Sequence, residues 1–498
     1  MGGFVAIYGP NAENELDLAR TMLSRIKHRG PDFENMFSDT GIILGYVGRK
    51  ASPVSNAVEI PFADSDNSAA VTCDAEIYNA EDFLPEKAPE GTVESKSARA
   101  IIGAYRRAGN SCASKLDGQF SFVLFDKGDI LAARDPLGGI PLYVADRDEL
   151  TILASELKAL RGLAVNVREF PSGHFYHSPS GFQEYFKLES RIAEAQSVES
   201  VCERLRKVVE NAVQRRVSCC NSKKGVFLSG GIDSSVIAAL VCKYLPGVDS
   251  FTVGMENSED VPYARQVASH VGTNHHEYTY DLNEVLDVLP KVIYHLESFD
   301  APLVRSSIAN FIASREARKE VDTILIGEGG DENFGGYHHV KRFKEPADQQ
   351  REFLRLFLGL HNNGFMRTDR MNWAHSLAVR APFFDSGVVK FALTIHPELK
   401  LYGEEQTEKW ILRKAFEDCL PKEVVWRPKK QFARGSGSDD LLTRYAENEI
   451  SDKVFEAEKR KYSGVDLRWK EEWLYFNMFK EHFGDAPSTL ATVGRWYE

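Results

Sequence analysis

The segment 229–235, Ser-Gly-Gly-Ile-Asp-Ser-Ser, constrains this chain more than any other feature. It joins an apolar strand expected at 224–228 to a helix expected at 234–244. Glycines let backbone N–H groups approach a phosphate closely, serine hydroxyls donate further hydrogen bonds, and a helix N-terminus adds partial positive charge. No Lys-Ser or Lys-Thr pair follows the glycines, so the segment is not a Walker motif. The sequence therefore predicts a phosphate-binding loop in which Asp233 holds a Mg²⁺ ion.

Further strand–helix units follow this loop. Strands are expected at 250–253 and 323–326, with helical patterns at 261–271 and 285–318. Alternating units of this kind predict a doubly wound parallel sheet, whose ligand site lies at the carboxyl ends of its strands. From about residue 350 the pattern is mostly helical and rich in charge. We therefore expect residues 191–498 to form an α/β domain with added helices.

The first 190 residues have a different pattern, in which short strands separated by Gly, Pro and Asp outnumber the helices. This pattern predicts a β-sandwich flanked by helices, and hence a separate domain over 1–190. Helical patches are expected near 14–27 and 97–108. The expected strands are 4–8, 42–46, 69–73, 120–125, 130–134, 142–145 and 150–154.

Composition excludes several classes of protein. The net charge of −12 disfavours binding to the phosphate backbone of nucleic acids. No apolar run approaches the roughly 18 residues that cross a bilayer, so no membrane partner is expected. The 7 cysteines include no CxxC pair, which argues against a zinc site and against a disulfide framework. The expected compartment is the cytoplasm.

A second dense motif, 326–337, begins Ile-Gly-Glu-Gly-Gly-Asp and follows the strand expected at 323–326. In a parallel sheet its carboxylates emerge at the same edge as the first loop. Asp331 is therefore expected to face Asp233 as a second Mg²⁺ ligand, and Glu328 lies in the same turn.

Together these motifs resemble the asparagine synthetase family of ATP pyrophosphatases, and the resemblance extends over nearly the whole chain. The resemblance implies that the loop binds ATP and its pyrophosphate, that ATP is split into AMP and pyrophosphate, and that Glu328 meets the attacking amine. It also implies that Lys429 reaches the pyrophosphate, with Lys430 as the adjacent alternative. The implied nucleotide positions are Leu228, Ser229, Gly230, Gly231, Asp233, Ser234, Ser235, Val253, Gly254, Met255, Gly327, Gly329 and Lys429.

The N-terminal half resembles the class II glutaminase domain of that family, an Ntn-hydrolase-like αββα sandwich, but its nucleophile is missing. Gly2 stands where glutamine-hydrolysing members have cysteine, and glycine has no side chain to attack an amide. Arg49 and Glu76 persist, whereas Asp74 replaces an asparagine, and the segment 95–99 lacks the acid that grips the glutamine amine. We therefore expect this domain to be structural and inactive as a glutaminase.

The acid substrate is less constrained. Arg305 matches an arginine that holds the substrate carboxylate in the family, a role suited to a planar guanidinium. Pro302 and Leu303 stand where asparagine synthetases have two threonines. The segment 378–385 also lacks an acid that normally lies two residues before its arginine. The resemblance makes aspartate the first candidate without assigning it.

The leading hypothesis is a ligase that adenylates a carboxylate of an amino acid and then accepts attack by ammonia or an amine. One alternative is an intramolecular lactam synthetase, in which Tyr would be expected in place of Glu328. Another is a non-catalytic pseudoenzyme, against which the intact Asp233, Asp331, Glu328 and Lys429 argue. The sequence leaves open the acid, the nitrogen donor, the pathway and the oligomeric state, a homodimer included.

Overall fold

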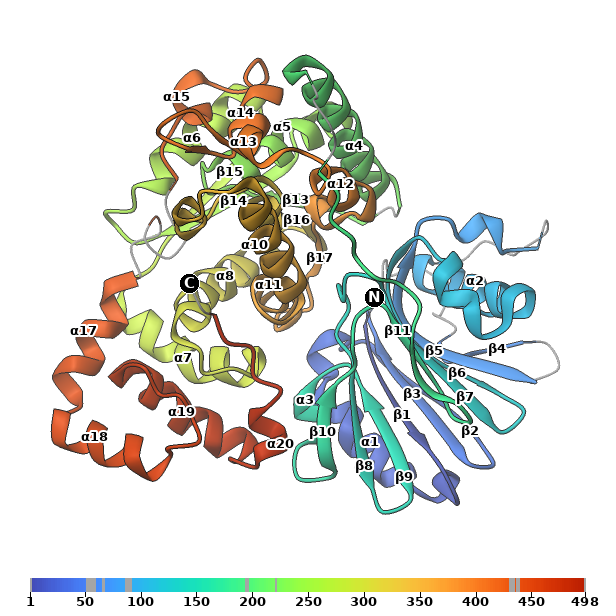
Figure 1. Cartoon of the computed structure of the whole chain (residues 1–498). Helices are drawn as coiled ribbons and strands as arrows, with labels where there is room; N and C mark the ends of the chain where they lie inside the picture. Colours follow the sequence, from blue (N-terminus) through green and yellow to red (C-terminus); the bar gives the residue numbers. More distant parts are fainter. Residues whose placement is uncertain are drawn as a thin grey trace. The chain divides into compact units, whose positions relative to one another are not determined.

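The computed structural model describes residues 2–50, 60–64, 68–85, 92–192, 197–219, 222–429, 435 and 439–496. These residues form two compact units (Figure 1). The first unit comprises 1–188 with 219–222 and 485–492, and the second comprises 189–218, 223–484 and 493–498. The division expected at 190/191 placed 485–492 in the second domain, whereas in the structure this segment packs with the first unit.

The first unit contains two antiparallel sheets of six strands each. Their orders are β10-β8-β9-β1-β3-β2 and β12-β11-β7-β6-β5-β4. The strands are β1 (Gly3–Tyr8), β2 (Phe33–Asp39), β3 (Ile42–Gly48), β4 (Phe62–Ala63), β5 (Ala69–Ile77), β6 (Gly118–Asp126), β7 (Asp129–Arg134), β8 (Tyr143–Arg147), β9 (Leu150–Ala154), β10 (Val165–Glu169), β11 (His174–His177) and β12 (Gly181–Glu184).

Helices cover the outer faces of these sheets and give four layers. The helices α1 (Leu16–Arg25) and α3 (Leu157–Leu160) pack on the first sheet, and α2 (Val93–Ala108) packs on the second. Because β5 is covered on both faces, it is buried at every residue, including its polar residues Thr72, Asp74 and Glu76. The predicted αββα sandwich is confirmed. The short helix α20 (Pro487–Leu490) contacts β10.

The second unit is built on a five-stranded parallel sheet, β15-β14-β13-β16-β17. Its strands are β13 (Lys224–Phe227), β14 (Asp249–Gly254), β15 (Asn274–Thr279), β16 (Thr323–Leu325) and β17 (Ala378–Arg380). A two-stranded ribbon, β18 (Leu401–Tyr402) with β19 (Thr407–Glu408), is separate. The predicted doubly wound sheet is confirmed. The strand β17 lies in a stretch expected to be mostly helical, because three residues are too few to show a strand period.

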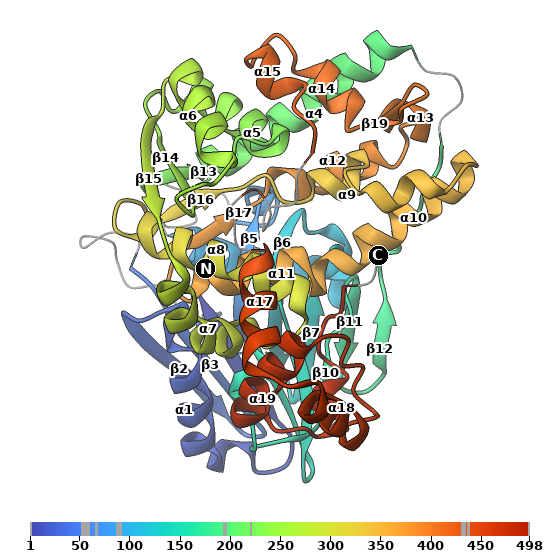
Figure 2. The ribbon, with the colours of Figure 1, turned by 90° about the vertical axis from the view of Figure 1, so that its left-hand side faces the viewer.

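Helices lie on both faces of this sheet, with α4, α5 and α6 on one side and α7, α8 and α11 on the other (Figures 1 and 2). No helix among the described residues is both long and apolar enough to cross a membrane. The helices of the second unit are α4 (Val198–Ser218), α5 (Ile232–Tyr244), α6 (Asp260–Val271), α7 (Leu282–Leu296), α8 (Ala301–Arg318), α9 (Gly330–Phe334), α10 (Pro346–Gly359), α11 (Gly364–Trp373), α12 (Ser386–Ala392), α13 (Pro397–Lys400), α14 (Trp410–Ala415), α15 (Lys422–Val425), α17 (Asp439–Glu449), α18 (Asp452–Lys461) and α19 (Lys470–Phe483).

One lysine is buried without a counter-charge in this unit. The Lys400 side chain, at the end of α13, is 0% exposed, and its ammonium lies 4.5 Å from the centroid of the Phe353 ring. Its Nζ has no hydrogen-bond acceptor among the described residues. Burial lowers the pKa of Lys400 from 10.5 to about 7. The folded state therefore holds fewer protons than the unfolded state between those two pH values.

We expect Lys400→Met to stabilise the protein in a pH-dependent way. The cost of burying Lys400 is absent above about pH 10.5, grows as the pH falls, and is complete below about pH 7. The variant should gain about 2–4 kcal/mol at pH 6.5 and little near pH 10. Thermal and guanidinium unfolding at several pH values measure this gain, with the exposed Lys207→Met as control. A gain that does not depend on pH contradicts the expectation.

Candidate active site

The site lies where the direction of strand order changes in the parallel sheet. Successive strands lead from β13 through β14 to β15 on one side, whereas β16 and β17 lie on the other side of β13. Since β13 and β16 are parallel neighbours, with Val226 opposite Leu325, both chains leave the sheet at the same edge. Loops that diverge at such a point leave a crevice for a ligand. The two predicted motifs therefore face each other.

Glycines allow these two loops to approach closely. A Cβ atom on Gly330 would lie 2.4 Å from Oδ1 of Asp233, and one on Gly327 would lie 2.7 Å from the amide nitrogen of Ser234. A Cβ atom on Gly336 would lie 1.7 Å from Oδ1 of Asp331. Gly327 and Gly330 are thus explained by packing against the first loop, and Gly336 by packing against the Asp331 carboxylate.

The first loop is organised by its own serines. The Ser234 hydroxyl accepts a hydrogen bond from the Ser229 amide at 3.1 Å, and the Ser235 hydroxyl donates to the Gly231 carbonyl at 2.7 Å. The helix α5 then begins at Ile232 behind Gly231, which has no side chain to cap it. The first backbone N–H groups of this 13-residue helix therefore remain available to an anion.

Four charged side chains meet between the loops. The ammonium of Lys409 forms ion pairs with both Asp233 and Asp331, the latter at 2.6 Å, and Lys429 forms a second ion pair with Asp331. The Lys409 side chain is 2% exposed, whereas those of Asp233 and Asp331 are 19% and 22% exposed. Lys409 is thus buried beneath the two carboxylates, which are more exposed than it is and face a cavity.

The pKa values of this cluster follow from burial and from the two lysines. Burial raises the pKa of Asp233, and the neighbouring Asp331 charge adds to this effect, against the opposing Lys409. Burial also acts on Asp331, but Lys409 and Lys429 outweigh it and hold its pKa well below the ordinary value. The two carboxylates likewise raise the pKa of Lys409 despite its burial. Asp331 and Lys409 are therefore charged at neutral pH.

Glu328 lies on the same side of the cavity and is held by Arg367 from α11 at 2.5 Å. Behind it, Glu332 accepts a hydrogen bond from the Tyr337 hydroxyl at 2.6 Å. Burial first, and then the charges of Glu328 and Asp331, raise the pKa of Glu332 to about 8. Glu332 is therefore a neutral acid at pH 7.

A cavity of about 890 Å³ opens onto this cluster. The predicted positions that do not line it are Gly230, Ser235, Gly254 and Met255. Lys430 lies outside the described residues. The predicted positions that line it are Leu228, Ser229, Gly231, Asp233, Ser234, Val253, Arg305, Gly327, Glu328, Gly329, Asp331 and Lys429.

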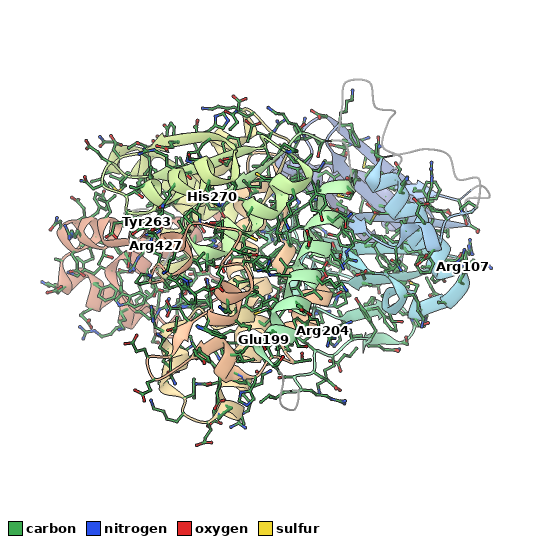
Figure 3. The ribbon with its side chains drawn as sticks, turned by 90° about the horizontal axis from the view of Figure 1, so that it is seen from above. Arg107, Glu199, Arg204, Tyr263, His270 and Arg427 are labelled. Carbon is green, nitrogen blue, oxygen red and sulfur yellow. The ribbon has the colours of Figure 1, made fainter. Side chains whose placement is uncertain are left out.

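Several cavity residues were not predicted from the sequence. Lys409 directly precedes α14, has a left-handed backbone with φ of 57°, and pairs with Asp233 in the site. Arg367 and Trp496 gave no local signal. Arg427 lies beside Tyr263, with its guanidinium 4.0 Å from the ring centroid, and pairs with Asp260 at 2.8 Å (Figure 3). For Arg427, the sequence offered one indication, which is that this cation lies two residues before Lys429.

Arg305 lines the cavity as predicted for a substrate-binding residue, but its guanidinium is already engaged. Its Nε donates to Glu471 at 3.1 Å, and a second, shorter bond joins the same pair. Its role toward a substrate carboxylate stays a prediction.

In the first unit, Gly2 lies in a space that excludes a larger residue. A Cβ atom on Gly2 would lie 2.2 Å from the Val47 carbonyl oxygen and 2.6 Å from the Tyr46 hydroxyl. The Gly2 amide donates to Asp74 at 3.4 Å, and Asp74 forms a buried ion pair with Arg29 at 2.9 Å.

The other two positions predicted from the resemblance to a glutaminase domain, Arg49 and Glu76, lie in the same unit. Glu76 is buried in β5, and Arg49 is half-buried directly after β3. Asp74 and Glu76 therefore belong to a packed interior, in which Arg29 also pairs with Glu156 at 2.8 Å.

Comparison with known proteins gives the family. A profile described as asparagine synthase matches residues 204–347 and 340–488, and one described as a glutamine amidotransferase domain matches 1–215. The chain belongs to the asparagine synthetase family.

Three relatives illustrate how far the similarity extends. A probable glutamine-hydrolysing asparagine synthetase of Dictyostelium discoideum is 32% identical over 517 residues, covering 96% of this chain and 92% of that protein. A Schizosaccharomyces pombe protein of the same description is 34% identical, with coverages of 95% and 91%. Asparagine synthetase B of Escherichia coli is 32% identical, with coverages of 96% and 89%.

We expect Lys409→Met to destabilise the second unit, because it leaves two facing carboxylates without their shared cation. Breaking a buried pair of this kind costs about 3–5 kcal/mol. The melting temperature should fall by several degrees, whereas Lys414→Met, which removes a 41%-exposed pair with Glu417, should leave it nearly unchanged.

The double variant Lys409→Met/Asp233→Asn should recover part of the loss, since one of the facing charges is then removed. Calorimetric unfolding of the three variants measures this recovery. Equal losses in Lys409→Met and Lys414→Met contradict the assignment of Lys409 as the central cation.

Proposed function

We propose that this chain is an ATP-dependent ligase that forms an amide from a carboxylic acid and ammonia or an amine, releasing AMP and pyrophosphate. The observation that carries this proposal is the juxtaposition, in one cavity, of a phosphate loop with Lys409 and Lys429 and of an accessible glutamate, Glu328. The phosphate loop and the two lysines suit departure of pyrophosphate. Glu328 suits removal of a proton from an amine.

The first step joins the acid to the nucleotide. A carboxylate oxygen attacks the α-phosphorus of ATP, the bond from that phosphorus to the bridging oxygen breaks, and pyrophosphate leaves with the electron pair. Lys409 and Lys429 lie where charge accumulates on the leaving group, and fixed cations in a site of this kind stabilise the transition state. The free N–H groups at the start of α5 add to this stabilisation.

The second step forms the amide. The amine nitrogen attacks the acyl carbon, loses a proton, and AMP departs with the bonding electrons. Glu328 is the group placed to receive this proton, and its pairing with Arg367 fixes its orientation. Arg367 is therefore a positioning residue.

The residues fit a magnesium ion. Oδ1 of Asp233 is buried and has no hydrogen-bond donor among the described residues, so one carboxylate oxygen is left for another ligand. Asp331 presents a second carboxylate, and Mg²⁺ prefers such oxygens together with those of phosphates. Asp233 and Asp331 would hold the ion, which when bound supplies positive charge to the phosphates. With their carboxylates engaged in this way, Lys409 and Lys429 would be available to the pyrophosphate.

The nitrogen donor that we propose is free ammonia or an amine, because the first unit is not built for glutamine hydrolysis. The space at Gly2 has no room for a cysteine side chain, and Asp74 is paired with Arg29. The intact charged cluster supports a catalyst over a non-catalytic binding protein. Glu328 supports attack by a separate amine over lactam formation.

We expect pyrophosphate release from Mg·ATP to require both a carboxylic acid and an intact Asp233. Asp233→Asn should lower the rate at least about 100-fold, since it removes one of two metal ligands. Glu328→Gln should instead lower amide formation more than acid-dependent exchange of pyrophosphate into ATP, because it acts after adenylation. Equal losses of the two activities in Glu328→Gln contradict the role of Glu328 as base.

We expect Gly2→Cys to create no glutaminase. Its Cβ would collide with the Val47 carbonyl, so the melting temperature should fall by about 5 °C or more. Gly464→Cys, where a Cβ would meet nothing within 4 Å, is the matched control. Glutamate release from glutamine by the Gly2→Cys protein, at a rate that supports amide formation, contradicts this expectation.

A further inference from the structure

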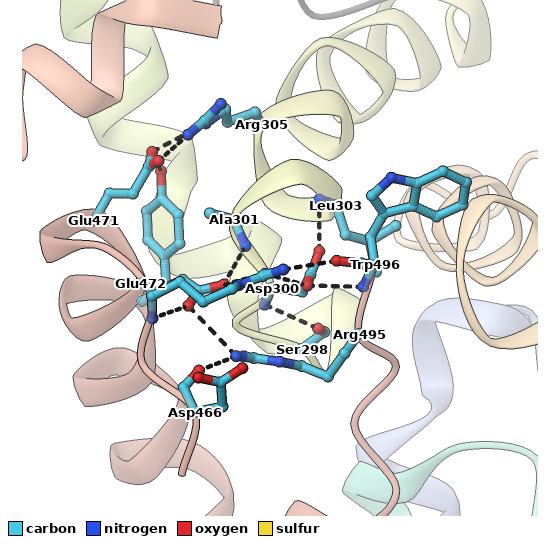
Figure 4. Close-up of polar contacts among 12 residues, drawn as sticks. Ser298, Asp300, Ala301, Leu303, Arg305, Asp466, Glu471, Glu472, Arg495 and Trp496 are labelled. Atoms are coloured by element: carbon cyan, nitrogen blue, oxygen red, sulfur yellow. Dashed lines mark hydrogen bonds and ion pairs between the residues drawn. The ribbon is translucent and has the colours of Figure 1, made fainter. Parts of the chain in front are cut away.

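The cavity extends beyond the phosphate loop to a second end, formed by α8, the start of α19 and the segment 493–496. Leu303 and Arg305 come from the first turns of α8, Arg468 and Trp469 directly precede α19, and Trp496 closes this end. Figure 4 shows Arg305, Leu303 and Trp496 around the buried Asp300 and Glu472. If the proposed ligase reaction holds, this end receives the acid.

The arginines at this end are already neutralised. Arg305 is bound by Glu471 (Figure 4). Arg468 donates to Asp300 at 2.6 Å and to Glu472 at 2.9 Å. All three carboxylates are buried, with side chains that are at most 1% exposed. An acid that needed either arginine would have to leave a buried carboxylate without its partner.

The phosphate end differs in this respect. Asp233 and Asp331 are 19% and 22% exposed, so a metal ion can take their charge and release the lysines. Glu471 and Glu472 are closed off from the cavity, and a metal cannot do the same for Arg305 or Arg468. The pairing is therefore permanent at the acid end and exchangeable at the phosphate end.

The uncharged polar side chains at the acid end are satisfied within the protein. The Ser306 hydroxyl donates to the Pro302 carbonyl at 3.0 Å, and the Thr368 hydroxyl donates to the Phe365 carbonyl at 2.9 Å. The Asn310 amide donates to Ser314 at 3.3 Å. The hydroxyl and amide hydrogens of these side chains are therefore already used in hydrogen bonds within the protein.

The remaining surface is apolar and aromatic, and it is held rigidly. The Trp496 amide donates to Asp300 at 2.9 Å, and its carbonyl accepts from Arg468 at 2.6 Å. Asp300 also accepts from the Leu303 amide at 3.1 Å, so one carboxylate fixes both Leu303 and Trp496. The Trp496 ring lies 5.0 Å from that of Tyr337, between centroids.

We propose that the acid is a monocarboxylate with an apolar, aromatic body that lies against Leu303, Trp469 and Trp496. Its single carboxylate is the group that reacts with ATP, and the rest of the molecule carries no second acid. Aspartate is disfavoured, because its second carboxylate has no uncommitted cation to bind among the described residues of this end. This inference rests on the proposed ligase function and narrows its substrate.

The test uses the full chain and calorimetric titration with four acids, 3-phenylpropanoate, hexanoate, succinate and aspartate, in the presence of a non-hydrolysable Mg·ATP analogue. We expect 3-phenylpropanoate to bind most tightly, and aspartate and succinate to bind about 100-fold more weakly or not at all. Aspartate as the tightest ligand overturns the inference.

Two variants assign the effect to this end of the cavity. Trp496→Ala should weaken 3-phenylpropanoate at least about 10-fold and leave binding of the ATP analogue unchanged. Trp473→Ala, on α19 but outside the cavity lining, is the matched control.

Glu471→Gln removes the charge that neutralises Arg305 while keeping the shape of the side chain. This variant should raise the affinity for succinate about 10-fold and leave the affinity for 3-phenylpropanoate unchanged. If Trp496→Ala does not weaken 3-phenylpropanoate, or if Glu471→Gln does not raise the affinity for succinate, the inference is overturned.

Pyrophosphate release with the same acids separates the two proposals. Release that is fastest with aspartate overturns the substrate class alone. Selective binding of 3-phenylpropanoate without pyrophosphate release from any acid overturns the ligase function, whereas the binding site that we assign to the aromatic body remains.

Discussion

The ion pair of Lys409 with both Asp233 and Asp331 is the interaction on which the site depends. These carboxylates come from loops after different strands, and without a cation between them they would repel each other in a partly buried space. The same helix start fixes the second lysine, because Glu408 accepts from the Lys429 amide at 2.9 Å and Arg413 donates to the Arg427 carbonyl at 2.9 Å. The segment from Glu408 to Arg413, which leads from β19 into α14, thus positions both lysines.

The two ends of the cavity use paired charges for different purposes. At the phosphate end the carboxylates of Asp233 and Asp331 are 19% and 22% exposed, and in the mechanism that we propose they would hold a metal ion. At the acid end the carboxylates are sealed within α19 and the start of α8, so the arginines serve to hold the wall in place. A buried pair is a poor source of stability but a strong constraint on geometry, and here it fixes Trp496 and Leu303.

The first unit is packed closely around Gly2. Its two sheets bury strands on both faces, and that packing does not depend on residue 2. Gly2 leaves Tyr46 and Val47 packed directly against the start of the chain, while Arg29 pairs with both Asp74 and Glu156. These ion pairs lie within an interior that is otherwise largely apolar.

The sequence by itself determined the features that depend on neighbouring residues. The strand, loop and helix over 224–244 and the alternation of strands in the first unit are local patterns, so they predicted the sheets, the phosphate loop and the facing of Asp233 and Asp331. Only the tertiary structure decided that Lys409 joins them, because it lies 176 residues from Asp233. It likewise decided that Glu471, 166 residues from Arg305, neutralises it. Such pairings depend on the packing of distant segments, and no local period or spacing records them.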